Sequence, residues 1–208
     1  MKYDRKEAVR YMGGRAGDER AGVLADLAYL KLRNEVQARS VYRVLDCRTD
    51  ANGVLLGGEY FKSAKLAAHI KGCTRAVLLA ATLGPKVDIA LRRMAVANIA
   101  EGAAGQAVCA ALIESYCDET EEKISAEYGG LHFKLRFSPG YADWSLADQQ
   151  RLLAMLDAPK RIGLTVTAGG MLAPVKSVTA VIGITETCEK QQSSCETCEN
   201  NANCVYKK

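Results

Sequence analysis

The chain has 208 residues, which is too short for two large enzyme domains, and its 49% hydrophobic and 25% charged residues are ordinary for a globular protein. The formal net charge of +4 comes from 28 basic and 24 acidic residues spread along the chain, which argues against a nucleic-acid-binding face. Because the start is polar and no apolar run reaches the roughly 20 residues that span a bilayer, we expect a cytoplasmic protein that is not bound to a membrane.

Two amphipathic helices are predicted at the start, over residues 5–12 and 18–38, with the break GGRAG between them. The leucines of the second helix recur at near-helical spacing and are expected in the core: Leu24, Leu27, Leu30 and Leu32. The stretch SVYRVLDC carries β-branched and aromatic residues in alternation, so it predicts a strand over residues 40–47. The following RTDANG is predicted to be a turn.

The middle of the chain predicts further helices and a buried strand. A helix in YFKSAKLAAHIKG is expected to end at Gly72, and RAVLLAATLG is expected to form a buried strand. Pro85 suits the first turn of a helix, and the Ala- and Leu-rich residues 85–128 predict one or two long helices. Within them, the small residues of AEGAAGQAVCAA predict that a neighbouring element packs closely.

The last part of the chain predicts the end of a main domain and a separate tail. After Gly129 and Gly130 a strand leads into RFSPGY, and a helix over residues 146–156 follows. The stretches RIGLTVT and KSVTAVIGI are predicted to be the last two strands of a domain that spans residues 1–186. Residues 187–208 are polar apart from cysteine and cannot build a core of their own, so they are predicted to be a separate Cys-rich tail.

The tail carries four cysteines with the spacing C-x6-C-x2-C-x5-C: Cys188, Cys195, Cys198 and Cys204. A C-x2-C pair lets two thiolates face one metal, and the outer cysteines can complete a tetrahedral set of ligands. Three interpretations stay open, namely an iron-sulfur cluster, structural zinc, and a tail without metal or with disulfides. The four other cysteines lie in apolar contexts and are expected in the core: Cys47, Cys73, Cys109 and Cys117.

A catalytic hydrolase site is not expected. His69 and His132 are the only histidines, and neither places a base beside a nearby serine or cysteine, as a Ser-His-Asp or Cys-His site requires. The segment around His69 predicts a helix end, and the turn ATLGP has too few glycines for a phosphate-binding loop.

The corner RFSPGY has the chemistry to hold a small zwitterion. Arg136 offers a planar fork of N–H donors that suits a carboxylate. Pro139 and Gly140 predict a turn that exposes backbone amides, and Tyr141 adds a flat ring with a hydroxyl. The same six residues are equally compatible with a purely structural turn.

Residues 136–184 closely resemble the reactivation domain of vitamin B12-dependent methionine synthase, whose hallmarks are R-x-x-P-G-Y followed by a helix, an IG strand and a P-x-x-S-V strand. The resemblance extends through AVRYMGG, LLAATLGPKVD and ALIESYCDE to the stand-alone bacterial form of that domain. It implies an α+β fold in which helices flank a C-shaped, twisted antiparallel sheet. It also implies a shallow groove for S-adenosylmethionine.

The resemblance implies roles for individual residues of that groove. Arg136 would hold the carboxylate of S-adenosylmethionine, and Tyr141 would lie beside the sulfonium. Glu114 in LIES matches an acidic residue that lines the groove. The backbone that would contact the nucleoside belongs to Phe137, Ser138, Pro139 and Gly140. The acidic residue that the larger enzyme has shortly before its R-x-x-P-G-Y has no counterpart in YGGLHFKLRFSPGY.

The function implied by the resemblance is reductive remethylation of inactive cob(II)alamin, with S-adenosylmethionine as methyl donor. Since the chain lacks homocysteine, folate and cobalamin modules, the cobalamin is expected on a separate methionine synthase chain. An electron donor such as flavodoxin or ferredoxin is then expected as a second partner. A tail that holds an iron-sulfur cluster would deliver the electron to the cobalamin or bind the donor protein. Two alternatives stay open: a capping module without methyl transfer, and a reactivator of another corrinoid methyltransferase.

Overall fold

A computed structural model of the protein describes residues 1–15, 17–129 and 132–185. Seven α-helices lie in these residues: α1 (Arg5–Tyr11), α2 (Glu19–Leu32), α3 (Ala64–His69), α4 (Pro85–Ala97), α5 (Ile99–Glu127), α6 (Gln149–Leu156) and α7 (Ala158–Ile162). A 3-10 turn (Leu146–Asp148) precedes α6. The strands are β1 (Arg39–Thr49), β2 (Gly53–Leu56), β3 (Glu59–Lys62), β4 (Arg75–Thr82), β5 (His132–Phe133), β6 (Thr165–Val166), β7 (Leu172–Ala173) and β8 (Ser177–Thr185).

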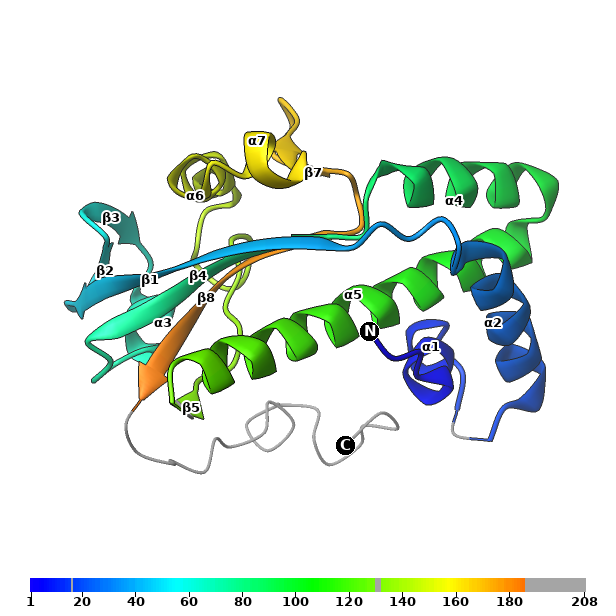
Figure 1. Cartoon of the computed structure of the whole chain (residues 1–208), viewed down its shortest axis with the longest axis horizontal. Coiled ribbons are helices and arrows are strands. Elements are labelled where there is room, and N and C mark those ends of the chain that lie inside the picture. Colours follow the sequence, from blue (N-terminus) through cyan, green and yellow to red (C-terminus); the bar gives the residue numbers. More distant parts are fainter. Residues whose placement is uncertain (16, 130–131, 186–208) are drawn as a thin grey trace.

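Six of these strands form one antiparallel sheet in the order β3-β2-β1-β4-β8-β5 (Figure 1). The centre of the sheet is β4, which is buried on both faces after its first residue. Strands β6 and β7 form a separate two-stranded ribbon. The structure therefore confirms an α+β fold with an antiparallel sheet flanked by helices.

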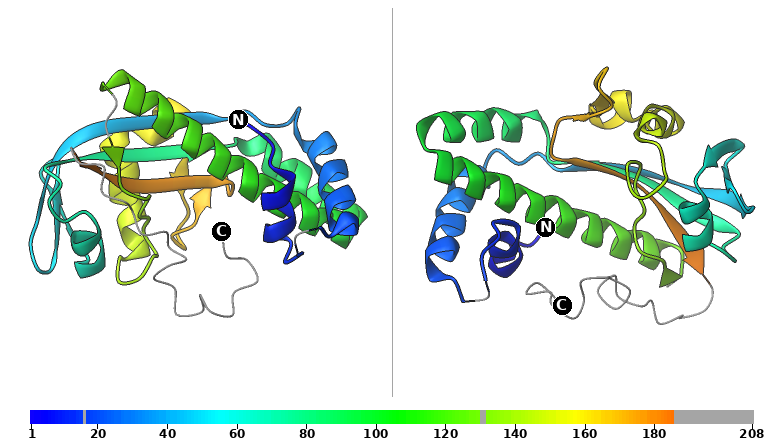
Figure 2. Two further views of the ribbon diagram at one scale, coloured as in Figure 1. Left: turned by 90° about the horizontal axis from the view of Figure 1, so that it is seen from below. Right: turned by 180° about the vertical axis from the view of Figure 1, so that it is seen from behind.

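Each face of the sheet has its own hydrophobic core. Helix α5 crosses one face, and α1, α2 and α4 pack around it (Figure 2). In this core, Leu79 and Ile182 of the sheet pack with Leu112 of α5. Helices α3, α6 and α7 cover the other face, where Leu78 and Val181 pack with Leu152. After α5 on one face, the chain passes the edge of the sheet at β5 and continues to α6 on the other face.

The small residues of α5 allow α4 to approach closely, as the sequence predicted. A Cβ added at Gly102 would lie 2.6 Å from the Cα of Ala95, and one at Gly105 would lie 2.9 Å from Leu91 Cδ2. The loop between the two helices is a single residue, Asn98, whose side chain accepts from the amide of Ala100 at 2.9 Å. One long helical stretch therefore folds back on its neighbour.

Three predictions about secondary structure are wrong. Helix α2 ends at Leu32 rather than at residue 38, because the Gln37 amide bonds to the Leu83 carbonyl at 2.9 Å and draws this segment into line with β4. Leu27 and Leu30 of α2 are half-exposed, whereas Leu32 is buried. The strand predicted over RIGLTVT is present only at Thr165–Val166, because its first two residues, Arg161 and Ile162, end helix α7 just before Gly163 in a left-handed conformation.

The third wrong prediction concerns β3, because the helix expected in YFKSAKLAAHIKG begins only at Ala64 and its first three residues, Tyr60 to Lys62, belong to a hairpin of β2 and β3. Gly57 and Gly58 both have positive φ and form its two-residue loop. The Asp50 carboxylate accepts from the amide of Gly53 at 2.8 Å and from the hydroxyl of Tyr60 at 3.0 Å, which fixes the hairpin to the end of β1.

The four cysteines expected in the core are buried free thiols. Burial raises the pKa of Cys109 to about 12, so this thiol stays protonated. None of the helices in the described part of the chain is long and apolar enough to cross a membrane. Cys188, Cys195, Cys198 and Cys204 lie outside the described residues, so the metal site and the domain boundary at residue 186 stay predictions.

Candidate ligand-binding site

The corner that carries R-x-x-P-G-Y is tied to the edge of the sheet. Phe137 and Val181 of β8 exchange backbone hydrogen bonds of 3.0 and 2.9 Å. Beyond this bridge the chain turns: the amide of Tyr141 donates to the Ser138 carbonyl at 3.1 Å, and the amide of Gly140 donates to the Trp144 carbonyl at 2.8 Å. Gly140 has φ +86°, which favours glycine at this position.

Asp143 and Trp144, which follow Tyr141, anchor the corner to the rest of the domain. The Asp143 carboxylate accepts from the hydroxyl of Ser63 at 2.5 Å and from the amide of Ala64 at 2.8 Å, so it joins the corner to the start of α3. Trp144 is buried and packs edge-on against Phe61, with ring centroids 5.9 Å apart. Its indole N–H donates to Asp148 at 3.0 Å, which satisfies its polar atom.

The side chain of Arg136 points toward α5, where three carboxylates surround it. Its Nη2 donates to Glu114 at 2.7 Å, and its Nη1 donates to Asp118 at 2.8 Å and also to Glu121. Positions 114, 118 and 121 lie one turn apart on the same face of α5, so a single helix supplies all three. Glu114 and Arg136 are thus brought together, and the roles that the resemblance implied for them toward a ligand stay predictions.

Burial and charge act against each other in this cluster. Burial alone would lower the pKa of Arg136, but the attraction of Glu121 and Asp118 raises it, so the guanidinium stays charged. Burial raises the pKa of Glu121 above its ordinary value, and the nearby guanidinium offsets only part of that effect. Burial likewise raises the pKa of Cys117, which lies on α5 next to Asp118, to about 12.

The aromatic side chains of the corner form a second group. Phe137 packs against His69 and Trp144, with ring centroids 5.3 and 6.2 Å away. The ring of Tyr141 meets Phe137 edge-on at 6.1 Å and is 70% exposed. His69 also bonds through Nε2 to the Leu135 carbonyl at 2.8 Å, so the end of α3 supports this group.

Arg136 and Phe137 face opposite layers, because Arg136 contacts α5 whereas Phe137 packs with the core under α3 and α6. A ligand that reaches both Arg136 and Tyr141 must therefore lie across the edge of the sheet.

The expectation of freely exposed backbone amides holds for one residue at most. The amides of Phe137, Gly140 and Tyr141 are used within the fold, and Pro139 has none. Within the turn from Phe137 to Tyr141, the amide of Ser138 is the one that lacks a partner among the described residues. The turn thus offers a ligand one donor and the faces of its side chains.

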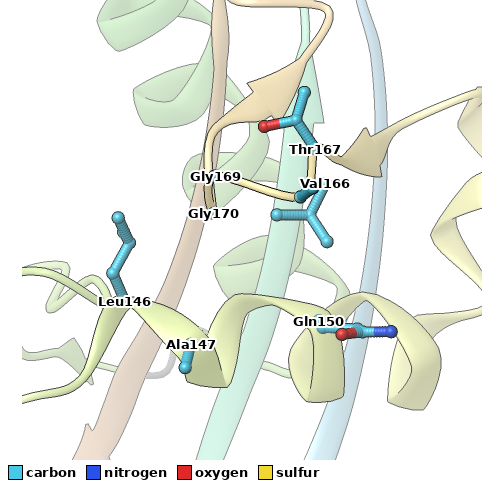
Figure 3. Close-up of a pocket in the computed structure, with 8 residues that line it drawn as sticks. Leu146, Ala147, Gln150, Val166, Thr167, Gly169 and Gly170 are labelled. Atoms are coloured by element: carbon cyan, nitrogen blue, oxygen red, sulfur yellow. The ribbon is translucent and has the colours of Figure 1, made fainter.

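A cavity of about 510 Å³ opens beside the corner (Figure 3). Leu146, Ala147 and Gln150 line it from the 3-10 turn and α6, and the glycine-rich loop between β6 and β7 lines it from the other side. A Cβ added at Gly140 would lie 3.2 Å from Leu146 Cδ1, so Leu146 stands between this cavity and the R-x-x-P-G-Y turn.

Sequence reasoning missed Asp118, Glu121, Asp143 and His69. The helical spacing of Asp118 and Glu121 from Glu114 was a usable signal, whereas no sequence pattern indicated that His69 or Asp143 would reach the corner. Across the described ranges, no three His, Cys, Asp or Glu side chains are grouped so as to hold a metal ion.

No protein-family model matches the sequence, and no curated protein matches it. Among solved structures, the chain is similar to the crystal structure of the MetH reactivation domain bound to AdoHcy, with a TM-score of 0.62 and 14% identity. The match covers 84% of this chain and 68% of that one. The fold described above is therefore that of the MetH reactivation domain.

Proposed function

We propose that this chain binds S-adenosylmethionine at the Arg136–Tyr141 corner and supports reductive remethylation of cob(II)alamin on a separate cobalamin-dependent methionine synthase chain. The observation that carries the proposal is the direct contact of Arg136 with Glu114, 22 residues earlier, in a fold shared with a protein that was solved bound to AdoHcy. AdoHcy is the form of S-adenosylmethionine that remains after the methyl group has left.

The donor set at the corner fits this ligand. Three of the five N–H donors of Arg136 are engaged by α5, which leaves two for a carboxylate. The exposed ring of Tyr141 offers a π face to a sulfonium, since cations are attracted to the faces of aromatic rings. Ser138 offers one backbone amide to the nucleoside.

S-adenosylmethionine supplies an electrophilic methyl group when bound. The contribution of the chain is to hold that methyl group in line with the acceptor and to exclude competing orientations. The cobalamin and the electron come from partners, the first on a methionine synthase chain and the second from a donor such as flavodoxin or ferredoxin. An iron-sulfur cluster on Cys188, Cys195, Cys198 and Cys204 would connect that donor to the domain.

The test is cobalt methylation with the purified full-length chain, a cobalamin-loaded methionine synthase module, S-adenosylmethionine and a chemical reductant, followed by absorbance. We expect methylation with the wild type and a loss of at least about tenfold in Tyr141→Ala, since the Tyr141 ring is exposed and its hydroxyl has no hydrogen-bond partner among the described residues. Tyr11→Ala, which removes an exposed tyrosine of α1, is the matched control. Capping of the module without any methylation would favour the non-catalytic alternative.

A further inference from the structure

Arg136 is surrounded by more negative charge than it can neutralise. Glu114, Asp118 and Glu121 all contact this one guanidinium, so two negative charges are left uncompensated within the cluster. A simple anion that approached Arg136 would add to this excess. A site of this kind is therefore unsuited to bind a lone carboxylate or phosphate.

The three carboxylates differ in how firmly the fold holds them. The side chain of Glu121 is 18% exposed, close to the 20% of Arg136, so this pair is a fixed part of the packing. Glu114 is 42% exposed and Asp118 is 65% exposed. Because exposed ion pairs contribute little to stability, the contact of Asp118 with Nη1 is the one that exchanges most easily.

We infer that Asp118 recognises the α-amino-acid end of the ligand by exchange, an inference that rests on the proposed function. The ligand carboxylate binds the N–H donors of Arg136 that α5 leaves free, and the Asp118 carboxylate exchanges its contact with Nη1 for hydrogen bonds from the ligand ammonium. Glu121 remains on Arg136 throughout and keeps the guanidinium oriented. Each charged group that loses a partner in this exchange gains another one, and no covalent bond is made or broken.

This arrangement selects a class of ligand. A zwitterionic amino-acid end leaves the charge of the cluster unchanged, and a sulfonium next to it reduces the negative excess. Asp118 is therefore a specificity-determining residue for cationic, zwitterion-bearing nucleosides. A neutral nucleoside without the amino-acid end gains nothing from it.

The experiment compares two probes by calorimetry on the full-length chain: S-adenosylmethionine, and 5′-methylthioadenosine, which lacks the amino-acid end. We expect Asp118→Asn to weaken S-adenosylmethionine about tenfold and to leave 5′-methylthioadenosine unchanged, because one charge-assisted contact is lost. Asp118→Glu should restore much of the affinity, which a change in folding would not do. Glu122→Gln, an exposed neighbour on the same helix, should behave like the wild type.

Two outcomes would overturn the inference while leaving the proposed function intact: equal affinity of Asp118→Asn and wild type for S-adenosylmethionine, or a parallel loss for both probes. If the wild type binds neither probe, the proposed function itself fails and the inference falls with it.

Discussion

Glu121 is the residue whose protonation should report most directly on the cluster around Arg136. Its pKa lies above the ordinary value of 4.5 in the folded protein, because burial outweighs the attraction of the guanidinium. The folded state therefore holds this proton more tightly than the unfolded state. Relative to Glu121→Gln, the stabilising contribution is complete below about pH 4.5 and is lost as the pH rises through the folded pKa.

The measurement is urea unfolding of wild type and Glu121→Gln at about pH 4 and about pH 7. The free energy of unfolding of the wild type minus that of the variant should be larger at the lower pH. The charged groups that face Glu121 are Arg136, Asp118 and Glu114, with the thiol of Cys117 nearby, and they are the same in both proteins. A difference that stays constant with pH, or that grows toward neutral pH, would contradict the raised pKa.

Trp144 holds the corner in place through packing and one hydrogen bond. Trp144→Ala should lower the free energy of unfolding by about 3–5 kcal/mol, because it removes a buried ring and leaves a cavity against Phe61. Trp144→Phe keeps part of the volume and loses the bond to Asp148, so it should cost less. Chemical denaturation followed by circular dichroism compares them, and equal losses would contradict a role for ring volume.

At the scale of elements, the close approach of α4 and α5 depends on Gly102. In Gly102→Ala the new methyl group would meet the Ala95 backbone, which cannot move away as a side chain can. We expect a loss of about 1–3 kcal/mol in stability, although alanine favours a helix over glycine by about 1 kcal/mol. Ala103→Ser, on the exposed face of α5, is the control in thermal unfolding. A more stable Gly102→Ala variant would refute the close packing.

The elements that the sequence predicted correctly are those whose signal is local. The strand around Val44, the buried run that became β4 and the proline start of α4 all follow from periodicity or backbone chemistry. Helix α7 was missed because Pro159 and Gly163, which are helix start and stop signals, were not used. The Gly57-Gly58 hairpin carried a similar unused signal.

The candidate site was predictable only in part, for a different reason. The motif gave Arg136 and Tyr141, and the resemblance gave Glu114. The contact of His69 with the Phe137 ring depends on where α3 packs. The anchoring of the corner depends on a hydrogen bond between Asp143 and Ser63, which are 80 residues apart in the sequence. Such long-range contacts follow from the tertiary fold and leave no periodic trace in the sequence.

At the scale of the whole molecule, the Cys-rich tail makes a chemical prediction. Protein purified without oxygen should contain iron and acid-labile sulfide, and a variant with serine at Cys188, Cys195, Cys198 and Cys204 should contain neither. Zinc in place of iron would support a structural site, and protein free of any metal would leave only the third interpretation. Chelation should remove the metal without unfolding the domain, because the tail is polar apart from its cysteines and has few side chains to add to a core.

The central claim is that the R-x-x-P-G-Y corner binds S-adenosylmethionine, and calorimetric titration with this ligand tests it most directly. The comparison is between wild type and Arg136→Lys, which keeps the charge among the α5 carboxylates but loses the planar fork. Both are titrated alone and with a cobalamin-loaded methionine synthase module. Saturable binding by the wild type that weakens about tenfold in Arg136→Lys is the predicted result. Absence of binding by the wild type under both conditions, or equal binding by the two proteins, would contradict it.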